Sequence, residues 1–219
     1  MNKEIFKINN IPAILWGEES AKLIIAVHGN MSNKADVPIE MLANVATNRG
    51  YQVLSFDLPK HGDRKDEDTL CKVVPCVNDL TEVIKYAKSK WQNISLFANS
   101  IGAYFSLLAY KNEDLQHAWF LSPVVDMNRL ISNMMMWFNV SEEKLEQEKE
   151  VPTPIGQTLY WDYYCYVKEN PIEKWDVPTH ILYGGKDDTC EFDTIKSFTE
   201  RFNCDLKIVP GGEHYFHTE

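Results

Sequence analysis

The sequence has no hydrophobic run long enough to cross a membrane, and it has little positive charge. A membrane-spanning helix needs about 20 consecutive apolar residues, and no segment provides them. The N-terminal segment MNKEIFKINNIPAILWG carries charges and lacks the apolar core of a signal peptide. Lys and Arg number 22 against 32 Asp and Glu, a formal net charge of -10. We therefore expect a cytoplasmic protein that binds neither membranes nor nucleic acid.

Cysteine is scarce and forms no recognisable metal or redox motif. The chain has five cysteines, an odd number, and no two of them have Cys-x-x-Cys spacing: Cys71, Cys76, Cys165, Cys190 and Cys204. Reduced thiols in a cytosolic protein are the simplest interpretation. We expect no metal and no cofactor. Internal repeats and low-complexity tracts are also absent, and 219 residues suit one domain with a substantial core.

Apolar runs alternate with amphipathic segments along the chain. The runs that predict strands cover 23–29, 51–59, 93–98, 117–123, 179–185 and 205–211, and helices are expected over 36–49, 77–90, 101–110 and near 191–202. Residues 1–16 could form a leading antiparallel hairpin. Continuous apolar strands separated by helices predict a mostly parallel sheet with helices on both faces.

The region of approximately 125–175 interrupts this alternation and is interpreted as an insertion within the single domain 1–219. It is rich in Met, Trp and Tyr, and it contains the acidic run SEEKLEQEKE. Two interpretations remain open, namely a substrate lid and two helices that complete the core. If it is a lid, the candidates for an apolar pocket are Trp137, Phe138, Tyr160, Trp161 and Tyr164.

Polar residues directly follow the predicted strands, at the edge of a doubly wound sheet where binding sites form. They comprise His28-Gly29-Asn30, Asp57 with His61-Gly62, Asn99-Ser100, Ser122, Lys186-Asp187-Asp188 and Gly211-Gly212-Glu213-His214. This set contains a serine, an acid and a histidine in that chain order. A hydroxyl is a poor nucleophile unless a base stands beside it, so the three residue types together suggest nucleophilic catalysis.

Five of these strand-end segments resemble those of the α/β-hydrolase superfamily, in the right order over nearly the whole chain. They are AVHGN (26–30), SFDLPKHGDR (55–64), ANSIG (98–102), ILYGGKDD (181–188) and VPGGEHYF (209–216). The second has Lys60 where the family usually has Gly, and the third has Ala98 at the first position of the nucleophile elbow. The resemblance implies the α/β-hydrolase fold, with a mostly parallel central sheet, flanking helices and a helical lid or cap insertion after the fourth predicted parallel strand.

The resemblance also implies a catalytic triad of Ser100, Asp187 and His214. His214 would take the Ser100 proton, and the carboxylate would orient the imidazole. The alternative for Ser100 is a plain helix N-cap. Asp188 and Asp126 are alternatives for the acid, and His217 is the alternative for the base. His28 and His61 are expected to brace the neighbouring loops.

An oxyanion hole is expected from backbone N–H groups at two of these strand ends. The residue after the nucleophile, Ile101, should supply one donor, and Asn30 the other, with Met31 as its alternative. Met31 and Asn99 are further substrate-binding candidates. The resemblance also implies a closing helix beyond the histidine, which the sequence would lack because it ends five residues after His214. No proposed catalytic group depends on that helix.

The resulting prediction is a cofactor-independent serine hydrolase that cleaves a small-molecule carboxylic ester through an acyl-enzyme. The same triad would serve a thioesterase, a lipase-like enzyme or a peptidase, because the pocket sets the substrate. A non-catalytic ligand-binding protein with this fold is the alternative from another class.

Overall fold

An eight-stranded mixed sheet forms the centre of the computed structural model, which describes residues 1–216. Its strands lie in the order β1-β2-β4-β3-β5-β6-β9-β10. Their bounds are β1 Lys3–Ile8, β2 Ile11–Trp16, β3 Lys22–Val27, β4 Gln52–Phe56, β5 Asn93–Asn99, β6 Ala118–Leu121, β9 Thr179–Gly184 and β10 Asp205–Val209. The hairpin β1–β2 joins β4 in antiparallel fashion, and all pairs from β4 to β10 are parallel. The mostly parallel sheet and the leading hairpin predicted from the sequence are thus confirmed.

Helices connect the parallel strands as the alternating pattern predicts. They are α1 Val37–Thr47, α2 Val73–Lys90, α3 Ile101–Ala109 and α7 Phe192–Phe202, with a short 3-10 turn at Gly62–Arg64. Helix α2 begins four residues before the expected start at Val77. Pro75 lies in its first turn, where a backbone N–H has no intrahelical partner to lose. The proline therefore does not prevent the earlier start.

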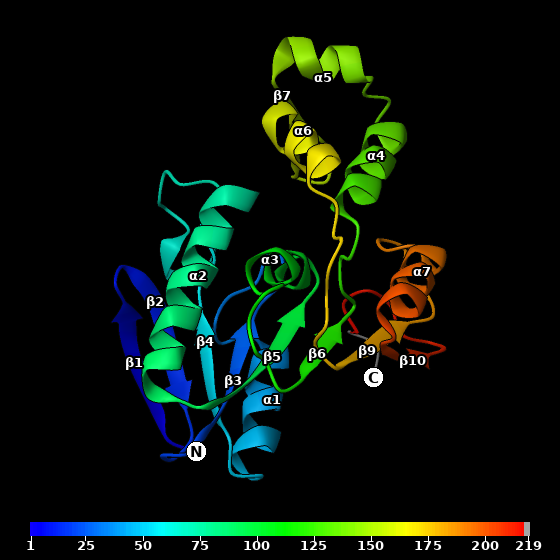
Figure 1. Cartoon of the computed structure of the whole chain (residues 1–219). Helices are drawn as coiled ribbons and strands as arrows, with labels where there is room; N and C mark the ends of the chain where they lie inside the picture. Colours follow the sequence, from blue (N-terminus) through cyan, green and yellow to red (C-terminus); the bar gives the residue numbers. More distant parts are fainter. Residues whose placement is uncertain (217–219) are drawn as a thin grey trace.

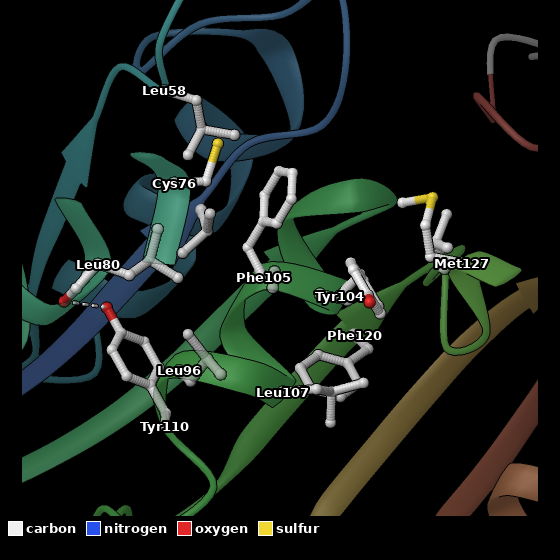
Figure 2. Close-up of a cluster of buried hydrophobic side chains, with 14 of the residues drawn as sticks. Leu58, Cys76, Leu80, Leu96, Tyr104, Phe105, Leu107, Tyr110, Phe120 and Met127 are labelled. Carbon is white, nitrogen blue, oxygen red and sulfur yellow. Dashed lines mark hydrogen bonds between the residues drawn. The ribbon is translucent and has the colours of Figure 1, made fainter. Parts of the chain in front are cut away.

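The two faces of the sheet are covered unequally. Helices α2 and α3 pack against each other and contribute to the larger buried cluster, in which Leu80, Phe105 and Tyr110 lie between helices and sheet (Figure 2). The Tyr110 hydroxyl donates to the carbonyl oxygen of Leu80 at 3.1 Å, which satisfies a polar atom in an apolar setting. A second, smaller cluster of buried residues joins α1 to the sheet. All of its helical members, including Ile39, come from α1. The core that supports the carboxyl ends of β5 and β6 is therefore mainly on the α2–α3 side.

The insertion rises beyond the carboxyl ends of the central strands (Figure 1). It consists of α4 Met127–Trp137, α5 Glu142–Glu148, β7 Glu150–Pro152, β8 Thr158–Tyr160 and α6 Trp161–Glu169. The acidic run forms α5, whose N-cap Ser141 accepts the N–H of Lys144 at 3.1 Å. The insertion is mainly helical, as expected, and also contains the antiparallel pair β7–β8. Gly156, at φ 78°, permits the turn that joins these two strands.

None of the helices within residues 1–216 combines the length and the apolar character that a bilayer crossing requires.

Candidate active site

Ser100 occupies a sharp turn between β5 and α3. Its φ of 50° and ψ of -120° lie outside the regions that a non-glycine residue normally adopts. Ser100 is the N-cap residue of α3 by position, yet its hydroxyl bonds to none of the described backbone N–H groups of that helix. A serine held in a strained turn without a capping bond is unlike an ordinary helix cap.

The turn depends on a very close approach of α3 to β3. A Cβ placed on Gly102 would lie 2.5 Å from the carbonyl oxygen of His28 and 2.8 Å from that of Val27. Ala98, at the first position of the elbow, is completely buried. Only glycine fits at 102, whereas at 98 the additional methyl group of alanine is accommodated in the core.

The structure brings Ser100, His214 and Asp187 together in one hydrogen-bonded series. The Ser100 hydroxyl lies 2.9 Å from Nε2 of His214, and Nδ1 of His214 lies 2.8 Å from Oδ2 of Asp187. Only 7% of Ser100 is exposed, and the side chains of His214 and Asp187 are 2% and 0% exposed. With Nδ1–H donating to the carboxylate, Nε2 is left as an acceptor for the serine hydroxyl.

Two backbone amides fix the orientation of Asp187. Its Oδ1 accepts the N–H groups of Thr189 and Cys190, each at 2.9 Å, and this leaves Oδ2 for His214. The structure places the two alternative acids elsewhere. Asp188 is exposed, and its carboxylate contacts the Thr189 hydroxyl. Asp126 accepts the N–H of Arg129 as the N-cap of α4. His217, the alternative base, lies outside the described residues.

The two residues predicted to supply oxyanion donors belong to segments that lie next to Ser100. Ile101 is the first residue of α3, and the loop that carries Asn30 passes so near Ser100 that a Cβ on Gly29 would lie 3.2 Å from the serine Cβ. Within residues 1–216, no acceptor is bonded to the N–H of Ile101 or of Asn30. Met31, the alternative to Asn30, already donates its N–H to Nε2 of His61 at 3.1 Å.

His28 and His61 each join two loops at the edge of the sheet. Nδ1 of His28 donates to the carbonyl oxygen of Gly29 at 2.7 Å, and Nε2 accepts the N–H of Leu58 at 3.0 Å. Complete burial lowers the pKa of His28 to about 4, so the ring is neutral near pH 7. His61 donates from Nδ1 to the carbonyl oxygen of Pro59 at 2.8 Å and accepts from Met31. The loop after β3 is thereby tied to the loop after β4.

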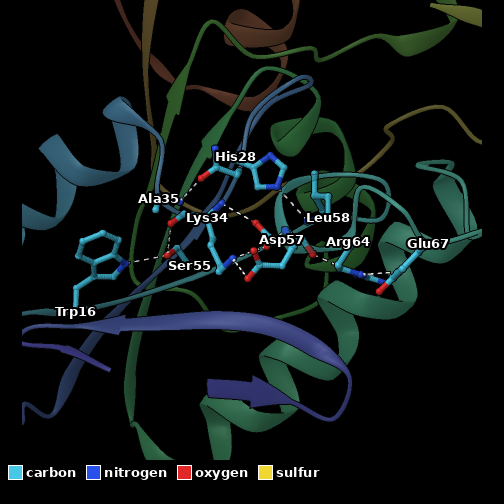
Figure 3. A network of polar contacts seen from close by, with 11 residues as sticks. Trp16, His28, Lys34, Ala35, Ser55, Asp57, Leu58, Arg64 and Glu67 are labelled. Carbon is cyan, nitrogen blue, oxygen red and sulfur yellow. Dashed lines mark hydrogen bonds and ion pairs between the residues drawn. The ribbon is translucent and has the colours of Figure 1, made fainter. Parts of the chain in front are cut away.

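A buried ion pair adds to this connection (Figure 3). The Lys34 ammonium lies 2.6 Å from Oδ2 of Asp57, and the Lys34 N–H donates to Oδ1 at 2.8 Å. The Ser55 hydroxyl donates to the carbonyl oxygen of Lys34 at 2.6 Å. Only 8% of the Lys34 side chain and none of the Asp57 side chain is exposed. Because both ends of the loop 28–34 are fixed, Asn30 has a defined position relative to Ser100.

The predicted lid aromatics do not line the cavity that opens between α3 and α7. This cavity, of about 770 Å³, lies between α3, the start of α4, the end of α6 and α7, and Tyr104, Met127 and Phe198 are among its lining residues. Neither Ser100 nor His214 lines it, and none of the five aromatic lid candidates does so in the described chain.

The five aromatic candidates have other environments within the insertion. Trp137 is 48% exposed, while Phe138 and Trp161 pack at the margin of the larger core cluster. The Tyr164 hydroxyl donates to Glu142 at 3.0 Å, and the Tyr160 ring lies under the ammonium of Lys72 at 4.0 Å. Asn99, another substrate-binding candidate, is the last residue of β5, and the side chain of Met31 is 81% exposed. Their placement is explained by packing and surface contacts.

One group of potential metal ligands overlaps the site. Asp187, Cys190 and His214 offer ligand atoms within 4.8 Å of one another, the one such group found in residues 1–216. Burial raises the pKa of the Cys190 thiol well above its usual range, so the sulfur stays protonated. Both ring nitrogens of His214 are engaged by Ser100 and Asp187. These contacts favour the hydrogen-bonded series over metal ligation.

Two neighbours of the series were not identified as functional from the sequence. The Tyr215 ring stands edge-on to the His214 ring, with centroids 5.0 Å apart. Ser122 directly follows β6 and has a φ of 41°, and its buried hydroxyl has no hydrogen-bond partner in residues 1–216. The position of Ser122 after a strand was visible in the sequence, but its strained backbone has no sequence signal.

The chain is similar in structure to several hydrolases. Est1E from Butyrivibrio proteoclasticus with bound ferulic acid matches with a TM-score of 0.80 and 19% identity over 99% of this chain and 92% of that one. Mouse alpha/beta hydrolase domain-containing protein 10 matches with a TM-score of 0.79 and 14% identity, over 98% and 91% of the two chains. The Pyrococcus furiosus esterase Pf2001 matches with a TM-score of 0.67 and 19% identity, over 97% and 84%.

No family model and no curated protein sequence matches the chain. The structural matches nevertheless show that it has the α/β-hydrolase fold, as its strand-end segments predict.

Proposed function

We propose that this protein is a serine hydrolase that cleaves carboxylic esters through an acyl-enzyme. The observation that carries the proposal is the series from Ser100 through His214 to Asp187, with contacts of 2.9 and 2.8 Å at a strained strand-to-helix turn. A non-catalytic member of the fold has no need of a serine in a costly backbone conformation aligned with a buried imidazole and carboxylate.

Each residue of the series would have a defined role in the reaction. Nε2 of His214 accepts the Ser100 proton as Oγ attacks the ester carbonyl carbon, and Asp187 stabilises the resulting imidazolium. The N–H groups of Ile101 and Asn30 bind the negative oxygen of the tetrahedral intermediate, where each donor contributes about 3–4 kcal/mol. His214 then protonates the departing alcohol, and water, activated by the same imidazole, releases the acid.

The structural neighbours favour esters over thioesters and amides as first substrates. One of them, Pf2001, is named an esterase, and another, Est1E, holds ferulic acid. Short p-nitrophenyl esters and methyl ferulate are therefore suitable probes, with an acyl-thioester, a monoacylglycerol and a peptide amide for comparison. The pocket determines which of them reacts fastest, because all share the same attack on a carbonyl carbon.

The test compares hydrolysis and fluorophosphonate labelling in the unaltered protein, Ser100→Ala and Ser122→Ala. Ser122 is a matched control because, like Ser100, it is a buried serine with a positive φ that directly follows a parallel strand at the same edge of the sheet. We expect Ser100→Ala to lower kcat by at least about 10³-fold and to abolish labelling, since removing a nucleophile leaves only binding and oxyanion stabilisation. Ser122→Ala should keep both. Unlabelled protein without ester turnover, stabilised by a bound ligand, would support a non-catalytic protein instead.

A further inference from the structure

Two of the cysteines lie together beside the proposed oxyanion loop. Cys71 precedes α2 by two residues, and Cys76 closes the first turn of that helix, where its N–H donates to the carbonyl oxygen of Lys72. Their sulfur atoms are 3.5 Å apart. A disulfide bond needs a separation of about 2.05 Å, which small side-chain rotations can reach from this distance. We propose that Cys71 and Cys76 are a site of reversible disulfide formation.

The surroundings of the two thiols make Cys71 the nucleophile. Its thiolate receives a hydrogen bond from Cys76 and is attracted by the positive charge of Arg64, and the pKa of Cys71 is lowered despite its burial. The nearby N-terminus of α2 favours a negative charge as well. Burial raises the pKa of the Cys76 thiol, and the neighbouring Cys71 adds to the effect. Cys71 is also partly exposed, whereas Cys76 is buried.

A peroxide would oxidise the pair in two balanced steps. The Cys71 thiolate attacks one peroxide oxygen, the O–O bond breaks, and the products are a sulfenic acid and hydroxide. The Cys76 sulfur then attacks the Cys71 sulfur, the S–O bond breaks, and hydroxide leaves. The hydroxides take up protons, one of them from Cys76, so two thiols and one hydrogen peroxide give one disulfide and two waters. A dithiol reductant reverses the change by thiol–disulfide exchange.

The pair lies where the insertion contacts the body of the protein. The residue after Cys71, Lys72, forms an ion pair with Asp162 of α6 at 2.9 Å and lies over the Tyr160 ring. On the other side, Cys71 interacts with His61, which accepts the Met31 N–H of the proposed oxyanion loop. A bond between Cys71 and Cys76 would therefore fix the segment that holds Lys72 against the first turns of α2.

The remaining cysteines provide internal controls. Cys165, Cys190 and Cys204 form no sulfur–sulfur hydrogen bond within residues 1–216. Cys190 is buried with a strongly raised pKa, and burial raises the pKa of Cys204 to about 11. Neither favours the thiolate that reacts with peroxide.

The experiment treats the full chain with one equivalent of hydrogen peroxide and maps its cysteines by mass spectrometry. We expect the loss of two hydrogen atoms, a cross-link between the peptides of Cys71 and Cys76, and full reversal by dithiothreitol. Cys165→Ser should behave like the unaltered protein. Cys76→Ser should stop at a sulfenic acid on Cys71, trapped by dimedone, and Cys71→Ser should react with neither reagent. A cross-link to another cysteine, or unreacted Cys71, would overturn the proposal.

Hydrogen exchange of the same samples tests the effect on the junction. The peptides that cover 65–72 and 160–169 should exchange more slowly after oxidation, and peptides from β9 and β10 should be unchanged. Equal exchange in the oxidised and reduced states would show that the bond does not act on the insertion. Both readouts are independent of ester hydrolysis, so they can fail or succeed whether or not the proposed activity is found.

Discussion

Asp187 holds His214 through a 2.8 Å hydrogen bond between Oδ2 and Nδ1, while two backbone N–H groups occupy its other oxygen. Three hydrogen bonds thus orient the carboxylate, and its side chain has no contact with solvent. The imidazole presents Nε2 to Ser100 in only one tautomer. The position of the acid, as well as its charge, therefore decides whether Ser100 has a base.

Asp187→Asn should lower kcat for a p-nitrophenyl ester by about 10⁴-fold, because an amide that donates to Nδ1 selects the wrong tautomer. The fold should be retained, since Asn keeps an oxygen for the Thr189 and Cys190 amides. Asp188→Asn is the matched control, because it removes an equal charge one residue away without touching His214. Steady-state kinetics and circular dichroism make the comparison. A larger loss from Asp188→Asn would assign the acid to Asp188.

Gly102→Ala should destabilise the protein by about 1–3 kcal/mol, in spite of the better helix propensity of alanine. The added Cβ would meet two backbone carbonyl oxygens of β3 and the loop after it, and backbone cannot rotate away as a side chain can. Gly211→Ala is the matched control, because a Cβ there has open space and the backbone needs no positive φ. Urea unfolding measures both variants. Equal stability of the two would contradict the close approach of α3 to β3.

The sequence predicted the parallel strands and their polar ends because both follow from local patterns. Continuous apolar runs mark buried parallel strands, and their carboxyl ends meet at one edge of the sheet. The choice between Asp187 and Asp188 could not be made in this way. It depends on which carboxylate receives the Thr189 and Cys190 amides, and that is a property of the loop conformation.

Contacts between distant segments were the part that the sequence could not provide. The aromatic residues 160–164 are candidates for a substrate pocket, but the sequence gives no sign that Tyr160 lies under Lys72 or that Tyr164 bonds to Glu142. Lys72 and Glu142 belong to no motif in the sequence, and hydrophobic periodicity does not predict contacts between such distant residues. Cys71 and Cys76 have a spacing that matches no dithiol motif, and they meet because α2 begins between them.

Asp57→Ala should destabilise the protein by about 3 kcal/mol, because it leaves the Lys34 ammonium buried with only the exposed Asp63 as a partner. The Lys34 and Asp63 N–H groups also lose their acceptors. Lys85→Ala is the control, since Lys85 pairs with Glu82 on the surface of α2, where solvent screens the charges. Urea unfolding midpoints compare the stabilities of the two variants. A loss no larger than that of Lys85→Ala would show that the ion pair is solvated.

The neutral state of His28 predicts a loss of stability in acid. Its pKa is about 4 in the folded protein and about 6.5 in an unfolded chain. Between these values the unfolded state binds more protons, so the free energy of unfolding rises with pH in that window. The contribution is fully present above pH 6.5 and is lost as the pH falls towards 4, roughly 3 kcal/mol in all. Urea unfolding at several pH values from 4 to 7 measures it.

His28→Asn isolates this contribution from that of the carboxyl groups that also titrate in acid. The variant should be less stable at pH 7, because the Leu58 N–H loses its imidazole acceptor. Its free energy of unfolding should then fall less steeply than that of the unaltered protein between pH 6.5 and 4. His117→Asn is the control. Because His117 is exposed, this variant should keep the pH dependence of the free energy of unfolding that the unaltered protein shows. If the free energy of unfolding changed with pH equally in His28→Asn and in the unaltered protein, the lowered pKa of His28 would make no contribution to the loss of stability in acid.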